Sequence, residues 1–194
     1  IEGGLCTTAL ITHGESGRHG IGRSGASIFP SLFQMQFEQP YGANRPPAMF
    51  TIPVMRFMKE YGVTEAQIAN VAVVQREWAG FHPRASFRDP ITVDGVLSSK
   101  MICYPFRLLM CCLVTDGGGA LILTKADRAR DFPQKPVYVR GTGESVETPL
   151  VSQMETFTSS KAFRVSGAKA FEEAGITHSD VDHLMIYDAF AHLP

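Results

Sequence analysis

The sequence predicts an α/β fold, because short segments of strand character alternate with helical patterns along the chain. Residues 6–12 and 121–124 are apolar or β-branched runs bounded by polar or glycine-rich segments, which is typical of buried strands. Residues 47–61 and 160–174 instead repeat their apolar side chains at helical spacing. With 44% hydrophobic and 19% charged residues, the 194-residue chain has the composition of a folded globular protein.

The first predicted strand, 6–12, is followed by a long segment rich in glycine, serine and proline. Its aromatic and methionine side chains indicate an ordered loop that packs on something, since long loops of this kind are usually functional or disordered. These side chains fit a bulky apolar acyl group, but an interface or a core would use them equally well. They are Phe29, Phe33, Met35, Phe37 and Tyr41.

Two helices are expected next. Proline is tolerated in a first helical turn, so Pro46 and Pro47 can open the helix over 47–61, whereas Pro53 is expected to kink or interrupt it. A capping box at Thr64–Gln67 predicts the start of a second helix. Residues 80–100 are expected to form a loop, because two X-Pro pairs within them are turn signals.

The second half of the chain continues the alternation. We expect a short helix over 126–131, a strand over 137–139, a helix over 160–174 and a strand over 184–187. Gly175 is placed to end the long helix.

The glycine run 117–119 has two interpretations. It fits neither of the common phosphate-binding patterns, because a strand rather than a helix follows it. The favoured alternative is that these glycines let two backbones approach closely. His13, at a strand end, is the most site-like histidine, although a structural role is favoured for it.

The apolar run 184–186 ends in Tyr187 and Asp188, which is how a buried strand delivers polar side chains to a cleft. From the residues alone, Tyr187 can anchor its hydroxyl structurally or act as a hydrogen-bond donor to a substrate. Asp188 either assists it or holds the turn through backbone hydrogen bonds. Cys112, just before the glycine run, either lines a pocket or is simply buried.

Charge and composition exclude several functions. The net charge is −1 and no basic run is present, so we expect no nucleic-acid partner. No apolar stretch approaches the roughly 20 residues that a membrane span requires. The cysteines and histidines match no zinc spacing, so no metal is expected, and reduced thiols indicate a cytoplasmic protein. The cysteines are Cys6, Cys103, Cys111 and Cys112.

Several motifs, in one order along the chain, together resemble a known family. They are the glycine-bearing segment 1–15, FEQPYG at 37–42, FRDPITV at 87–93, CCLVTDGGGA at 111–120 and YDAFA at 187–191. In this order the chain resembles the thiolase superfamily, specifically its sterol-carrier-type and lipid-transfer-protein branch. The resemblance runs through nearly all of the sequence.

The resemblance implies a layered α-β-α-β-α fold of two βαβαβ-type halves with an inserted loop domain. It also implies a homodimer that acts on acyl-CoA thioesters, with coenzyme A as part of the substrate and no separate cofactor. The chain is then an internal portion of a longer one, with the family's nucleophilic cysteine before Ile1 and its later histidine and cysteine motifs after Pro194. The implied parts are the end of the N-terminal half (1–15), the loop domain (16–107), the final strands of the N-terminal half (108–131) and the first part of the C-terminal half (132–194).

The same resemblance assigns the site. Tyr187 stands where ordinary thiolases keep an oxyanion-hole asparagine, and it resembles a subset described as retro-aldol lyases on steroid side-chain CoA thioesters, which work with an OB-fold partner. Tyr187 and Asp188 are then the catalytic candidates. The expected substrate pocket consists of Tyr41 near the acyl group, Cys112 near the pantetheine arm, Gly118 and Phe190.

Two kinds of function follow from this resemblance. The first is carbon–carbon bond chemistry through a thioester enolate, as a thiolase-like acyltransferase or as a retro-aldol lyase on lipid-CoA or steroid-CoA; both reactions need an oxyanion site. The alternative is a non-catalytic thiolase-like protein that binds lipid-CoA or serves as an assembly subunit.

Overall fold

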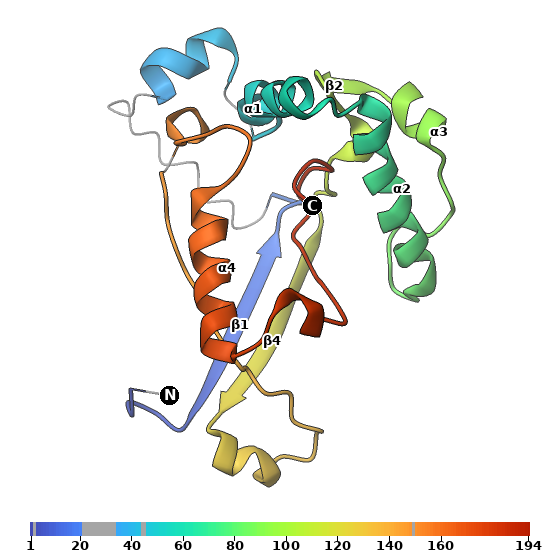
Figure 1. Ribbon diagram of the computed structural model, residues 1–194. Helices are drawn as coiled ribbons and strands as arrows, with labels where there is room; N and C mark the ends of the chain where they lie inside the picture. Colours follow the sequence, from blue (N-terminus) through green and yellow to red (C-terminus); the bar gives the residue numbers. More distant parts are fainter. Residues whose placement is uncertain (2, 21–33, 44–45, 149) are drawn as a thin grey trace.

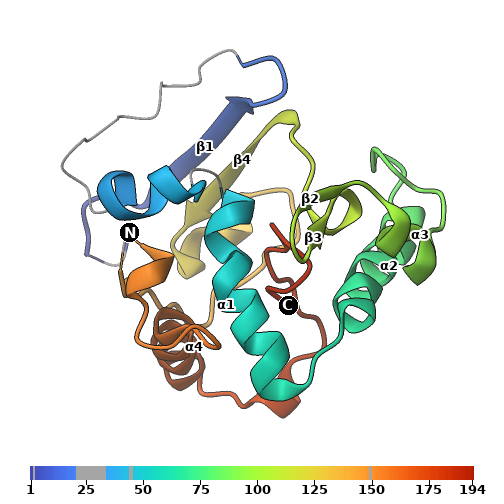
Figure 2. The same ribbon diagram turned by 90° about the horizontal axis from the view of Figure 1, so that it is seen from above.

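The computed structural model describes residues 1, 3–20, 34–43, 46–148 and 150–194. A long two-stranded ribbon forms one part of the molecule, with a helix alongside it and a helical lobe at one end (Figures 1 and 2). The elements are β1 (Thr8–Ser16), α1 (Pro46–Tyr61), α2 (Glu65–Phe81), α3 (Val93–Ser98), β2 (Met101–Cys103), β3 (Phe106–Arg107), β4 (Asp116–Thr124) and α4 (Lys161–Ala174). Short turns of 3-10 or π-helix are η1 (Gln34–Glu38), η2 (Gln39–Tyr41), η3 (Leu108–Met110), η4 (Ala126–Asp131), η5 (Val151–Gln153) and η6 (His178–Asp180).

The ribbon pairs β1 with β4 in antiparallel register, from Thr8 opposite Thr124 to Ser16 opposite Asp116. The strand β4 therefore begins at the glycine run, five residues earlier than the strand predicted over 121–124. The close approach expected of these glycines is present: a Cβ built on Gly118 would lie 2.7 Å from the carbonyl oxygen of His13.

The helical lobe follows the sequence pattern closely. α1 continues through Pro53, so this proline does not interrupt the helix, whereas the alternative of a kink stays a prediction. The proline is buried there, and the helix tolerates the one missing N–H donor. α2 begins with the predicted capping box, in which the Gln67 N–H donates to Thr64 Oγ1 at 3.3 Å and the Thr64 N–H donates to Gln67 Oε1 at 2.8 Å.

Part of the predicted loop over 80–100 is the short helix α3. Thr92 caps it by accepting a hydrogen bond from the Gly95 N–H at 3.0 Å. Within the part of the chain that the structure describes, no helix has the length and apolar character to cross a membrane.

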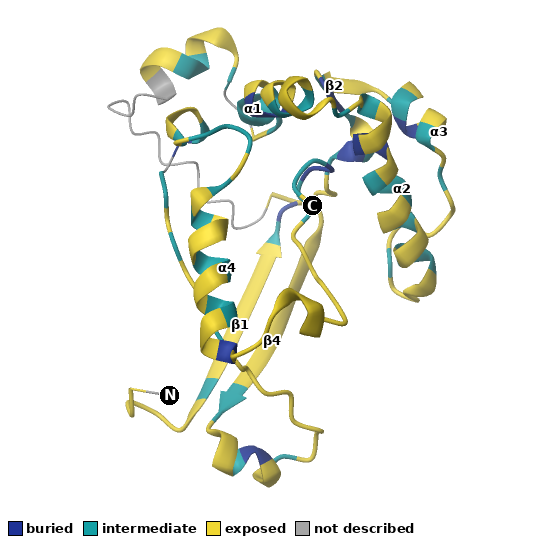
Figure 3. Cartoon of the chain, viewed as in Figure 1, coloured by how far each residue is buried: buried dark blue, intermediate teal, exposed yellow. Residues whose placement is uncertain are grey.

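The largest hydrophobic core lies in this lobe, and the C-terminal segment contributes to it (Figure 3). Helices and β3 supply most of its side chains, while two come from residues close to the C-terminus of the chain. Its buried members are Val54, Ile68, Ala69, Val96, Phe106, Met110, Phe190 and Ala191. The lobe and the C-terminal segment are therefore packed as one unit.

α4 confirms the helix predicted over 160–174, and Gly175 ends it with a left-handed φ of 66°. The extended segment before α4 lies directly against it, because a Cβ on Gly141 or Gly143 would overlap the α4 backbone at Ala170 or Ser166. Glu173 also accepts a hydrogen bond from the Thr142 N–H at 2.7 Å.

Two predicted strands are wrong. Residues 137–139 and 184–187 are extended but belong to no strand, and their apolar side chains are largely exposed. A strand requires a ladder partner, and among the described residues neither segment is paired with one. The short helix expected over 126–131 is the 3-10 turn η4. The predictions for Phe29 and Phe33 lie outside the described residues.

Candidate active site

Tyr187 is the last exposed residue of the extended C-terminal segment. Its side chain is 77% exposed, while the next residue, Asp188, is half-buried. The backbone then changes from exposed to buried within three residues and reaches Phe190 in the core. In place of the predicted strand end, Tyr187 lies at the end of an unpaired segment that leads into a buried anchor.

The anchor is a short antiparallel pairing between 110–112 and 189–191, here called the clamp. The Cys112 N–H donates to the Ala189 carbonyl and the Ala191 N–H donates to the Met110 carbonyl, each at 2.9 Å. Cys111 and Phe190 form the bridge between them. The clamp therefore brings two of the sequence motifs together, although 70 or more residues separate them in the chain.

The clamp places Cys112 and Phe190 beside the Tyr187 segment. Phe190 is only 6% exposed, with its ring 5.1 Å from Phe106 and 5.5 Å from Phe50 between centroids. Cys112 is exposed. Of the two predicted pocket residues here, Phe190 packs into the core and Cys112 faces the outside.

The other two predicted pocket residues lie elsewhere. Tyr41 is 89% exposed in η2, which stands apart from the C-terminal segment in both views (Figures 1 and 2). Gly118 lies in the ribbon opposite Gly14. Among the described residues, no hydrogen bond or ring contact joins Tyr41 to Tyr187.

The surroundings of the Cys111 thiol disfavour its ionisation. Burial, followed by the neighbouring thiols Cys103 and Cys112, raises its pKa to about 11. Because the thiolate is the nucleophilic form, Cys111 stays protonated, and its Sγ approaches the Arg107 carbonyl at 3.5 Å. The Cys111 side chain is therefore uncharged, and the clamp itself is held by backbone hydrogen bonds.

An Asp–His pair at the end of the ribbon where β4 begins was missed by sequence reasoning. Asp116 Oδ1 accepts hydrogen bonds from the backbone N–H groups of Arg18, at 2.8 Å, and His19, at 3.2 Å, while Oδ2 contacts His19 Nδ1. The His19 side chain, with these backbone donors, holds the pKa of Asp116 below its usual value, against a smaller opposing effect of burial. The only sequence signal was an aspartate directly before the glycine run 117–119.

His192 was also missed. Burial lowers its pKa to about 4, so the imidazole is neutral at physiological pH. Its Nδ1 atom is buried without a hydrogen-bond partner, as is Nε of Arg107. A single histidine two residues after a phenylalanine has no recognisable pattern, so this burial could not be predicted from the sequence.

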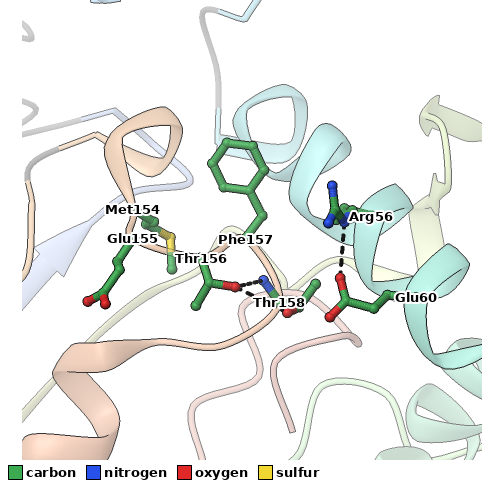
Figure 4. Close-up of a pocket in the computed structure, with 7 residues that line it drawn as sticks. All are labelled: Arg56, Glu60, Met154, Glu155, Thr156, Phe157 and Thr158. Atoms are coloured by element: carbon green, nitrogen blue, oxygen red, sulfur yellow. Dashed lines mark hydrogen bonds and ion pairs between the residues drawn. The ribbon is translucent and has the colours of Figure 1, made fainter.

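A small cavity of about 220 Å³ lies between α1 and residues 154–158 (Figure 4). At its α1 side, Arg56 Nε donates to Glu60 Oε2 at 3.0 Å. On the opposite side, the Thr158 N–H donates to Thr156 Oγ1 at 3.3 Å. None of the predicted site residues lines this cavity. In the described ranges no group of three or more His, Cys, Asp or Glu residues could hold a metal ion.

The ribbon, the helix α4 beside it and the helical lobe joined to the Tyr187 segment define a protein of the α/β class. A family model described as "Thiolase C-terminal domain-like" matches residues 143–194. The Ltp2-ChsH2(DUF35) aldolase superposes on the whole chain with a TM-score of 0.88 at 29% sequence identity, covering 51% of the aldolase chain. This chain belongs to the thiolase superfamily, in the branch that includes sterol-carrier-type proteins and steroid side-chain aldolases.

Two curated relatives illustrate the range of this family. The acetyl-CoA acetyltransferase of Methanothermobacter thermautotrophicus is 35% identical over 145 residues, which cover 75% of this chain and 38% of the relative. The steroid side-chain-cleaving aldolase of Thermomonospora curvata is 30% identical over 183 residues, which cover 91% of this chain and 47% of the relative. The chain thus spans less than half the length of these two relatives.

Proposed function

We propose that this chain carries part of the active site of an enzyme that cleaves a carbon–carbon bond next to a CoA thioester, with Tyr187 as the acid–base group. The observation that carries the proposal is the position of Tyr187, exposed at the point where the extended segment meets the clamp. A tyrosine phenol can accept or donate a proton at a substrate oxygen. Similarity to the steroid side-chain-cleaving aldolase supports this choice of reaction.

The proposed reaction needs no oxidant and no cofactor besides the coenzyme A of the substrate. Tyr187 in its phenolate form takes the proton of the β-hydroxyl of a β-hydroxyacyl-CoA, and the Cα–Cβ bond breaks. The β-carbon leaves as a ketone or aldehyde, and the bonding electron pair becomes the enolate of the shortened thioester. Tyr187 then returns its proton to Cα of the enolate, which regenerates the phenolate and balances atoms and electrons. Asp188 either assists Tyr187 or holds the turn.

Acyl transfer to coenzyme A is the second candidate, because the acetyl-CoA acetyltransferase is 35% identical to this chain. That reaction forms an acyl-enzyme on a cysteine thiolate. The raised pKa of Cys111 argues against that residue as the nucleophile. We further propose that the protein works with an OB-fold partner, and the structure of the Ltp2-ChsH2(DUF35) aldolase supports a partner protein. A homodimer and a cytoplasmic location are proposed on the family resemblance alone.

The decisive experiment supplies the purified complete protein, with its partner, with a β-hydroxyacyl-CoA or with a 3-ketoacyl-CoA plus free coenzyme A. Release of a carbonyl product from the first substrate supports cleavage, and thiolysis of the second supports acyl transfer. Turnover of neither substrate would favour the non-catalytic alternative, a lipid-CoA-binding or assembly subunit.

Tyr187→Phe tests the residue itself, because it keeps the ring and removes the hydroxyl. We expect kcat to fall by about 10²- to 10⁴-fold, the usual contribution of a general acid–base group. Tyr138→Phe is the matched control, since Tyr138 is also exposed but lies in the extended segment beside α4. Retention of wild-type kcat by Tyr187→Phe would refute the assigned role.

A further inference from the structure

Four rings close around the clamp and form a cluster here called the aromatic box: Phe50, Phe106, Phe190 and His192. The His192 ring lies 5.2 Å from Phe106 and 5.4 Å from Phe50 between centroids. It stacks on Phe190 at 6.1 Å with an interplanar angle of 22°. Phe50 comes from α1 and Phe106 from β3, so the box joins the helical lobe to the C-terminal segment.

The box and the clamp hold the same short stretch of chain. Two backbone hydrogen bonds fix residues 189–191, and the side chains on either side of Ala191, Phe190 and His192, pack in the box. Only Asp188 separates Tyr187 from this fixed stretch. Because one residue allows little independent movement of the backbone, the position of Tyr187 depends on how the box is packed.

His192 is the unusual member of the box. Its Nδ1 atom is buried without a hydrogen-bond partner, which costs free energy that a phenylalanine ring would not. Costs of this kind persist in functional regions where the surroundings require a particular geometry. Burial also keeps the imidazole uncharged, so the His192 ring packs against its neighbours as an apolar aromatic ring would.

We propose that His192 is a positioning residue whose ring, stacked on Phe190 within the aromatic box, sets the location of Tyr187 for reaction. This rests on the proposed function of Tyr187. His192 does not touch the substrate in this scheme; it acts through Phe190 and the clamp.

The test measures kcat and KM of the complete enzyme for a β-hydroxyacyl-CoA in three variants. His192→Ala removes the ring. We expect kcat to fall about 10- to 100-fold with KM nearly unchanged, because a small misplacement of a reacting group lowers the rate of the chemical step. His192→Phe keeps an aromatic ring at this position, so its kcat is expected within about threefold of wild type. His183→Ala is the matched control, an exposed histidine on the same segment before Tyr187.

A purely structural role predicts something different: fewer folded molecules, with a normal kcat for each active one. Active-site titration and calorimetry of each variant separate the two roles. If His192→Ala does not fold, His192→Leu keeps apolar volume without a planar ring and carries the same expectation. A normal kcat in the folded variant, while Tyr187→Phe is inactive, overturns the positioning role; an active Tyr187→Phe instead overturns the proposed function.

Discussion

At the scale of single residues, His192 makes the free energy of unfolding depend on pH. Its pKa is about 4 in the folded chain and near 6.5 in an unfolded one, so only the unfolded state gains a proton between these values. Folded-state stability therefore falls as the pH drops from about 6.5 towards 4. We expect the urea midpoint to fall between pH 7.5 and pH 5 by less in His192→Phe than in wild type. Equal losses in both would show that other groups account for the acid sensitivity.

Asp116 is a second residue with a definite expectation. Its ionised carboxylate accepts two backbone N–H groups, and its lowered pKa shows that the charged form is favoured. Asp116→Asn keeps the shape but removes the charge, so the amide protons of Arg18 and His19 should exchange faster with solvent. Hydrogen exchange followed by NMR measures this, with the Gly20 amide as an internal reference because it bonds to the Ser16 carbonyl instead. Unchanged exchange would mean that the carboxylate does not order this turn.

At the scale of elements, two neighbouring glycines of the ribbon differ in the space that is available for a side chain. A Cβ at Gly118 meets the His13 carbonyl at 2.7 Å, whereas one at Gly119 meets nothing within 4 Å. Gly118→Ala should therefore reduce the free energy of unfolding by about 1–3 kcal/mol, the usual cost of overpacking. Gly119→Ala, the control, should be neutral or slightly stabilising. Chemical denaturation measures the free energy of unfolding of both variants. Equal free energies of unfolding would contradict the close approach of β1 and β4.

The start of α2 offers a second test at this scale. Thr64→Ala removes the side-chain oxygen that accepts from the Gln67 N–H, and we expect a loss of about 1 kcal/mol. Thr64→Ser keeps the oxygen and should lie within a few tenths of a kcal/mol of wild type. Urea denaturation followed by the fluorescence of Trp78, the single tryptophan, measures both.

At the scale of the whole molecule, the ribbon exposes apolar side chains on both faces. Leu10 and Leu121 are more than half exposed, as is Ile122. Exposed apolar surface on a strand pair favours association. We expect a protein of these 194 residues alone to self-associate in a concentration-dependent way, measured by sedimentation velocity. Leu121→Lys should reduce the association, while Leu5→Lys, at a more exposed leucine outside the ribbon, should not.

Local chemistry made much of this fold predictable. The capping box at Thr64 and the glycine stop at Gly175 act within a few residues, and both are present as expected. The strands expected over 137–139 and 184–187 are not formed, because strand pairing depends on residues that are far away in the sequence. In the site, the sequence indicated Tyr187 and the motif around Cys112, but it could not show that the clamp joins them. The Asp116–His19 pair, 97 residues apart, and the box around His192 also arise only from tertiary packing.

Gly141 and Gly143 restrict how the segment that contains them can move relative to α4. With no space between these residues and the backbone of α4, the segment and the helix must move as a single body. The same contact narrows the mutations the protein can accept, because even a methyl group at either glycine would separate the helix from its neighbour.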